Sequence, residues 1–254
     1  MKNIFIFLPL ISLVFFFSAC KKTNTDSPSG LNCRMLELTG PLYESHCFYD
    51  DHHKIVKMRF IDSPADTSWE NYYYENGHVV YMIRLFQGTS GDTIYYTYNS
   101  GKYVEVNEYG FKLKFIYNDS GQLIKVERYE GSKVTDYSDY EYNQGGNCIR
   151  CIDYTWSGSE FAQEQITDLE FGNQKNPYSS IGLPPLNSTG WPTAMYLSPN
   201  NITKYRIQYT SQLMKLVLVY HYSSYNENGY PLAYSITDSL NHMISNENIQ
   251  YICP

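Results

Sequence analysis

Residues 115–126 read Phe-Ile-Tyr-Asn-Asp-Ser-Gly-Gln-Leu-Ile-Lys-Val. Phe115 and Tyr117 are two positions apart, so on a β-strand their side chains share one face. The next four residues, from Asn118 to Gly121, are of the types that supply the positive φ angles of a tight turn. An apolar, partly β-branched run follows the turn. The stretch therefore predicts a β-hairpin.

The same pattern occurs six times along the chain. The second aromatic or apolar residues of the first five copies are separated by 24, 19, 25 and 29 residues, and a period in the twenties is typical of repeat architectures. No amphipathic helix is expected between Cys33 and Phe171. We therefore predict an all-β fold, an antiparallel sheet of consecutive β-hairpins that is twisted or curled. The copies occupy residues 72–77, 96–101, 115–121, 140–146, 169–173 and 220–229.

Prolines interrupt the repeat at about residues 173–201, in the segments Asn176-Pro177-Tyr178, Pro184-Pro185, Trp191-Pro192 and Ser198-Pro199. Proline cannot donate to a sheet ladder, which excludes a central strand here. We predict a short irregular, Pro-rich insertion that contains a helical turn with Asn176 as N-cap and Pro177 at the first helical position. Residues 33–254 otherwise form a single all-β hairpin-repeat domain.

Residues 1–19 have the features of a lipoprotein signal peptide, because Lys2 precedes a short apolar run that ends in Ser18-Ala19. Cys20 follows these small residues and resembles the lipidated cysteine of the bacterial lipobox. The alternative is an ordinary secreted protein with Cys20 free. Residues 20–32 are rich in Ser, Thr, Asn and Pro and predict a flexible tether. We expect an N-terminal lipid to anchor the chain to the membrane.

The charge balance narrows the choice of partners. Removal of the signal peptide leaves 18 basic and 26 acidic residues, a net charge of about −8, which makes nucleic acid an unsuitable partner. The expected location is the outer membrane through the lipid anchor, with the periplasmic and cell-surface sides both open.

Cysteine positions predict one disulfide. Cys33 and Cys47 flank Thr39-Gly40-Pro41, and a hairpin centred near Gly40 would place them opposite each other. The alternative is two buried thiols. Cys148 and Cys151 have C-x-x-C spacing, but neither a helix N-terminus nor a second pair accompanies them, so they read as packing residues on opposite sides of a strand.

The unit from Tyr117 to Val126 resembles the YD repeats of bacterial cell-surface and Rhs-type proteins. The chain as a whole resembles an uncharacterised lipoprotein family of Bacteroidota, a domain of unknown function. The resemblance rests on these hairpins together with the lipobox, the segments 176–178 and 198–201, and the closing Tyr-Asn-Glu-Asn-Gly-Tyr-Pro-Leu at 225–232. The resemblance implies an exported lipoprotein and brings no catalytic residues with it. The short repeat spacing argues against a closed cage like that of Rhs toxins.

The sequence offers no catalytic motif. It contains no Gly-x-Ser-x-Gly, no Walker loop and no His-Glu-x-x-His, so we predict no enzyme activity, no metal and no cofactor. His52 and His53 follow Asp50 and Asp51, and this cluster reads as a solvated hairpin tip rather than a metal site.

Aromatic residues are the candidate binding groups. If the hairpins stack in order, Tyr74 and Tyr98 belong to a ladder across the sheet, and Trp69, Trp156 and Trp191 are placed to rim it for a glycan or protein ligand. The alternative is that the ladder is the core, because aromatic cross-strand pairs stabilise sheets. The expected function is a non-enzymatic binding or scaffold module; the alternative is a carbohydrate-binding or glycan-active protein of the cell envelope.

Overall fold

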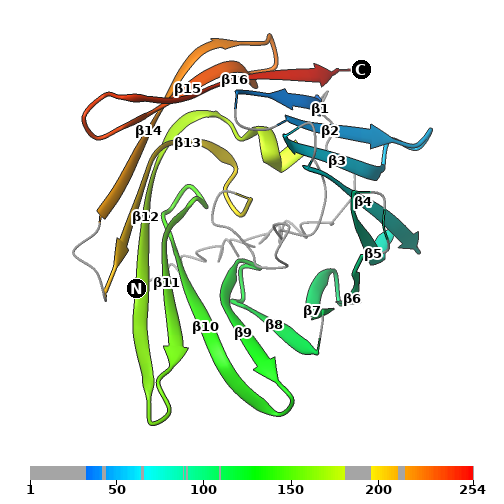
Figure 1. The fold of residues 1–254 in the computed structure, drawn as a ribbon, viewed down its shortest axis with the longest axis vertical. Helices are drawn as coiled ribbons and strands as arrows, with labels where there is room; N and C mark the ends of the chain where they lie inside the picture. The colour runs from blue at the N-terminus through cyan, green and yellow to red at the C-terminus, as the bar shows by residue number, and fades with distance from the viewer. Residues whose placement is uncertain are drawn as a thin grey trace, which may run out of the picture. The chain divides into compact units, whose positions relative to one another are not determined.

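The computed structural model describes residues 33–41, 44–63, 66–87, 89, 91–108, 110–180, 196–210 and 215–253. These residues form a closed antiparallel barrel of sixteen strands, arranged as a ring in Figure 1. Each strand pairs with the next one along the chain, and β16 returns to pair with β1. The elements are β1 (Arg34–Thr39), β2 (Glu44–Tyr49), β3 (Ile55–Ser63), β4 (Asp66–Glu75), β5 (His78–Phe86), β6 (Thr93–Asn99), β7 (Lys102–Glu108), β8 (Phe111–Tyr117), β9 (Leu123–Glu130), β10 (Lys133–Tyr142), β11 (Cys148–Trp156), β12 (Phe161–Lys175), the 3-10 turn η1 (Pro177–Ser180), β13 (Asn200–Tyr209), β14 (Lys215–Tyr225), β15 (Pro231–Asp238) and β16 (Met243–Ile252).

The prediction of an all-β fold built from consecutive hairpins is confirmed, but the twisted or curled sheet is wrong, because the sheet closes. Leu38 of β1 lies opposite Ile249 of β16 in an antiparallel ladder. An open sheet would leave unpaired backbone groups on its first and last strands. Closure satisfies those groups and encloses an interior in which side chains are buried.

The predicted Cys33–Cys47 disulfide is also wrong, because Cys33 is bonded to Cys253 and Cys47 is a buried free thiol. Glu37 lies opposite His46 in the β1–β2 ladder. This register places Cys47 three strand positions away from Cys33, about 10 Å along the strand. The observed disulfide instead joins the start of β1 to the end of β16, at the point where the barrel closes.

The Asn and Gly residues of the repeat form the turns. The side chain of Asn118 accepts a hydrogen bond from the Gln122 amide at 2.9 Å, which holds the four-residue connection closed. The two-residue turn at Asn76 and Gly77 has φ values of 49° and 86°, as a hairpin turn of this length requires. The bond made by Asn118 recurs at Asp50, Asn143 and Asn226.

The first aromatic of each clear repeat lies in the core of the barrel. Tyr72, Tyr96, Phe115 and Tyr140 are between 4% and 8% exposed. They pack with aliphatic residues such as Leu113 and Val126, which are fully buried. The interpretation of the ladder as core is therefore confirmed for these positions.

The second aromatic position of the repeat is usually tyrosine, because its hydroxyl makes a hydrogen bond that phenylalanine could not make. The hydroxyl of Tyr142 donates to the Leu123 carbonyl at 2.9 Å, from one strand of the hairpin to the strand beside it. Tyr98 departs from the pattern and stacks on His78 with ring centroids 3.5 Å apart. The same hydroxyl-to-carbonyl bond is made by Tyr49, Tyr74, Tyr117, Tyr222 and Tyr251.

We expect Tyr142→Phe to lower the free energy of unfolding by about 0.5–1.5 kcal/mol, because it removes one hydrogen bond and leaves a half-buried carbonyl without its partner. Urea unfolding of the purified chain measures this change. Tyr95→Phe is the control, since its ring is 57% exposed on the outer face, and its effect should be much smaller. Equal stability of Tyr142→Phe and the unaltered chain would contradict a structural role for the hydroxyl.

The described part of the insertion confirms the predicted helical turn. Asn176 accepts a hydrogen bond from the Tyr178 amide at 3.0 Å, as an N-cap does, and donates to the Ser198 carbonyl at 2.8 Å. Figure 1 shows η1 on the inner side of the ring near β1. The insertion therefore contributes side chains to the interior.

Cys148 and Cys151 are packing residues, as predicted, but both face the interior rather than opposite sides. Arg150 lies opposite Glu141, whereas Cys148 lies opposite Tyr142, so the intervening Ile149 forms a bulge that resets the alternation. Both thiols are buried. Burial raises the pKa of Cys148 to about 12, which keeps this thiol protonated and unreactive.

Candidate functional site

The candidate aromatics lie on two different faces of the barrel wall. Tyr74 packs against the interior core, whereas Trp69 lies outside, because adjacent residues of a strand point to opposite faces. Trp156 also lies outside and is 45% exposed. The expectation that these tryptophans rim the tyrosine ladder is therefore wrong. Trp191, like the lipidation candidate Cys20, lies outside the described residues.

An outer aromatic row follows the outside of β2 to β6. Tyr73 and Tyr81 stack with ring centroids 4.3 Å apart, and Tyr95 continues the row at 6.1 Å from Tyr81. Phe48 and Trp69 form a second pair at 6.2 Å. We call these five residues the outer aromatic row. Tyr73 and Tyr95 are 39% and 57% exposed, so both side chains remain partly open to a partner.

Cations cover one end of the row. The Lys57 ammonium lies 3.6 Å from the Trp69 ring centroid, and the Arg59 guanidinium lies 5.5 Å from it. Such cation–π contacts occupy the ring face and hold the side chains in place. Trp69 is thus less available than the tyrosines, although the sequence singled out the tryptophan.

Tyr95 also forms one wall of a shallow groove along β6 to β9. The groove has a volume of about 470 Å³, and Tyr129 forms another part of its lining. Asn107 and Lys112 line it as well, and the Lys112 ammonium lies 5.4 Å from the Tyr129 ring centroid. Aromatic surfaces next to amide and ammonium donors suit a ligand that has both apolar faces and hydroxyl groups, such as a sugar.

A second aromatic cluster lies on the outside of β10 to β12. Tyr137 and Tyr154 stack at 4.5 Å, and Phe161 packs edge-on against both Tyr137 and Trp156 at 5.0 and 5.1 Å. The Lys125 ammonium covers Tyr137 at 3.7 Å. Trp156 is the exposed member of this cluster.

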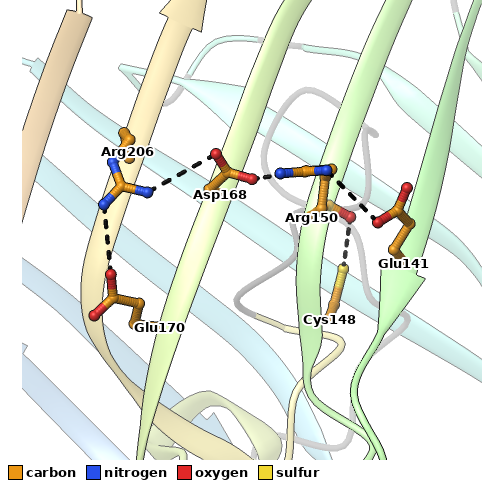
Figure 2. A network of polar contacts seen from close by, with 6 residues as sticks. All are labelled: Glu141, Cys148, Arg150, Asp168, Glu170 and Arg206. Atoms are coloured by element: carbon orange, nitrogen blue, oxygen red, sulfur yellow. Dashed lines mark hydrogen bonds and ion pairs between the residues drawn. The ribbon is translucent and has the colours of Figure 1, made fainter.

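The outer face of β10 to β13 carries a chain of ion pairs, shown in Figure 2. Arg150 contacts Asp168 at 2.7 Å and Glu141 at 4.0 Å. Arg206 contacts Asp168 at 3.9 Å and Glu170 at 3.4 Å. A barrel wall that faces lipid instead needs an outward apolar band about 25 Å tall, and Arg at its middle costs about 2–4 kcal/mol. This part of the wall has the chemistry of a surface in water.

The interior holds a buried group of charges that we did not predict from the sequence. Arg84 donates from Nε to Glu70 and from Nη1 to Glu108, each at 3.3 Å, and all three residues are 5% or 6% exposed. Tyr72 donates a short hydrogen bond to Glu70. Burial raises the pKa of Glu108, and the Arg84 guanidinium opposes that rise. The two carboxylates thus share one arginine, whose guanidinium forms an ion pair with each of them.

The described residues contain no group of three or more His, Cys, Asp and Glu side chains arranged to hold a metal ion. Asp50 accepts hydrogen bonds from the His52 and Lys54 amides, so its carboxylate belongs to the turn. Among the same residues, no helix is both long and apolar enough to cross a membrane.

Comparison with known proteins bears on the fold only. No protein-family model and no curated protein sequence match this chain. A porin-like protein from Bacteroides uniformis is similar in structure, with a TM-score of 0.52 and 10% identity over 89% of this chain and 98% of that one. A porin-like protein from Bacteroides vulgatus has a TM-score of 0.44 and 9% identity, over 87% of this chain and 99% of that one. The TcdB2-TccC3 structure has a TM-score of 0.34 and 15% identity, over 80% of this chain and 10% of that one. At 10% identity, the similarity to the Bacteroides uniformis protein supports the barrel fold and nothing further.

Proposed function

We propose that the chain is an exported lipoprotein, anchored to the outer membrane through a lipid on Cys20, whose barrel lies in water and serves as a non-enzymatic binding or scaffold module. The charged outer wall of β10 to β13 carries this proposal. An ion-pair chain from Glu141 to Glu170 suits contact with water and would be unfavourable in lipid. A barrel of this kind needs another means of membrane attachment, and the lipobox-like Cys20 provides one.

The interior supports binding or scaffolding rather than conduction. Porin-type channels have a polar, water-filled interior and an apolar exterior. Here the inward positions include the fully buried Ile94, Val106 and Leu113, and charged side chains such as Arg150 and Asp168 lie outside. The described wall thus has the polarity of a water-soluble barrel.

The outer aromatic row and the adjoining groove favour carbohydrate as the ligand class. Tyr73 and Tyr95 present exposed rings, and Asn107 and Lys112 add polar groups beside Tyr95. Hydrolysis of the bound glycan is the less favoured alternative, because a glycosidase needs two accessible carboxylates about 5–10 Å apart. Glu108 is the carboxylate that lines the groove, and it is 6% exposed and paired with Arg84.

A glycan array followed by calorimetry on its best ligand tests this function. We expect the double variant Tyr73→Ala/Tyr95→Ala to bind about tenfold or more weakly, because each lost ring contact contributes about 0.5–1.5 kcal/mol. Tyr137→Ala is the matched control, since it removes a tyrosine from a different part of the outer wall, and its affinity should be unchanged.

Release of reducing sugar from the same ligand is measured in parallel. Turnover would favour the glycan-active alternative over a binding module. Unchanged affinity in the double variant would contradict the outer aromatic row as the contact surface, and an array without any bound glycan would contradict carbohydrate as the ligand class.

A further inference from the structure

The barrel interior contains a cavity of about 290 Å³ next to η1. Its volume lies at the lower end of the range for ligand pockets, about 300–1,000 Å³, and is roughly twice that of a cavity known to hold benzene. The space therefore suits a compound of one or two rings. The lining is mainly apolar and aromatic, and includes Met35, Met58, Phe60, Tyr220, Tyr222 and Tyr234.

Glu247 of β16 also lines this cavity and is only 2% exposed. Ser245 donates a short hydrogen bond to one carboxylate oxygen, Oε1. The other oxygen, Oε2, is buried and has no hydrogen-bond partner. A buried acceptor without a partner is unfavourable, so this oxygen has a strong tendency to accept a donor.

Gly40 makes room for the carboxylate. A Cβ atom at this position would overlap Glu247 Oε1 and Oε2, so any larger residue would displace the acid group. The carboxylate thus sits in a space that the backbone of the neighbouring chain segment leaves open. This arrangement differs from that of Glu70 and Glu108, each of which forms an ion pair with Arg84.

Glu247 is the only charged residue among those described around the cavity. The rings of Tyr220 and Tyr222 lie 5.9 and 5.4 Å from that of Tyr234, which gathers three aromatic groups in the same lining. Aromatic rings together with a carboxylate form the usual environment for an ammonium group. A neutral apolar ligand would leave Oε2 unpaired, and an anion would be repelled.

We propose that this interior cavity binds a small apolar amine of one or two rings, with the protonated amine at Glu247 and the hydrocarbon part among Met58, Tyr220 and Tyr234. The site is separate from the outer aromatic row, so the proposal does not depend on the nature of the outer ligand.

Calorimetry with the mature full-length chain and three probes of matched shape tests the site. We expect tryptamine to bind, neutral 3-ethylindole to bind about tenfold or more weakly, and anionic indole-3-propionate to give no measurable heat, because only tryptamine supplies a charged donor to Oε2. Similar affinity for tryptamine and 3-ethylindole would overturn the role of charge, and no binding of tryptamine at millimolar concentration would overturn the site.

Glu247→Gln extends the test with almost no change in shape. We expect this substitution to lower the affinity for tryptamine by about tenfold or more and to leave the affinity for 3-ethylindole unchanged. Glu37→Gln is the matched control, because Glu37 lies on neighbouring β1 and its partner is His46 rather than the cavity. Tryptamine should still bind Tyr73→Ala/Tyr95→Ala normally. Unchanged tryptamine affinity in Glu247→Gln would overturn the proposal, and the probe series on the unaltered chain decides the matter if this variant does not fold.

Discussion

Cys20→Ala should move the chain from the membrane fraction to the soluble fraction almost completely. Each buried CH₂ of an acyl chain contributes about 0.8 kcal/mol to membrane binding, so a fully lipidated cysteine holds a protein firmly and its loss removes that attachment. The outer wall of β10 to β13 does not replace it, because Arg150, Asp168 and Arg206 favour water. Globomycin, which blocks maturation of lipoproteins, should have the same effect on the unaltered chain.

Membrane fractionation followed by immunoblotting measures this release. Cys47→Ala is the control, since it also removes a cysteine but alters a buried thiol within the barrel, and this variant should remain in the membrane fraction. Retention of Cys20→Ala after a carbonate wash would contradict lipid anchoring and would indicate that the barrel itself enters the bilayer. Release only by the wash would indicate a membrane-bound partner.

Local residue patterns were sufficient to predict the hairpins. The doublet Phe115 and Tyr117, the turn at Asn118 and the return strand from Leu123 all lie within a dozen residues, so their pairing is set by short-range geometry. Closure of the barrel depends on Leu38 meeting Ile249, which are far apart in sequence and share no motif. The bulge at Ile149 is equally hidden, because it depends on how β11 pairs with β10.

The site residues also differ in whether local sequence or strand pairing determines their position. Tyr73 stands between two inward aromatics of the repeat, and its position on the outer face follows only from strict strand alternation. Glu70 lies two positions before Tyr72 and therefore on the inward face, which was a readable signal of a buried acid. Its pairing with Arg84 required the β4–β5 register, in which these two residues stand opposite each other.

Loss of the Cys33–Cys253 disulfide should lower the free energy of unfolding by about 5 kcal/mol and the melting temperature by about 10–20 °C. The bond closes a loop with a sequence separation of 220 residues, so it restricts the unfolded chain strongly on the chain-entropy estimate. It also joins β1 to β16, where Arg34 lies opposite Ile252, and so holds the two strands that complete the ring.

Thermal unfolding of Cys33→Ser/Cys253→Ser measures this effect, and reductant should lower the melting temperature of the unaltered chain to the same extent. The variant itself should not respond to reductant, because its remaining described cysteines, Cys47, Cys148 and Cys151, are free thiols. If Cys33 were instead bonded to Cys47, reductant sensitivity would disappear in Cys47→Ala and persist in Cys253→Ser. Reductant sensitivity that persists in Cys47→Ala and disappears in Cys253→Ser therefore supports the Cys33–Cys253 bond.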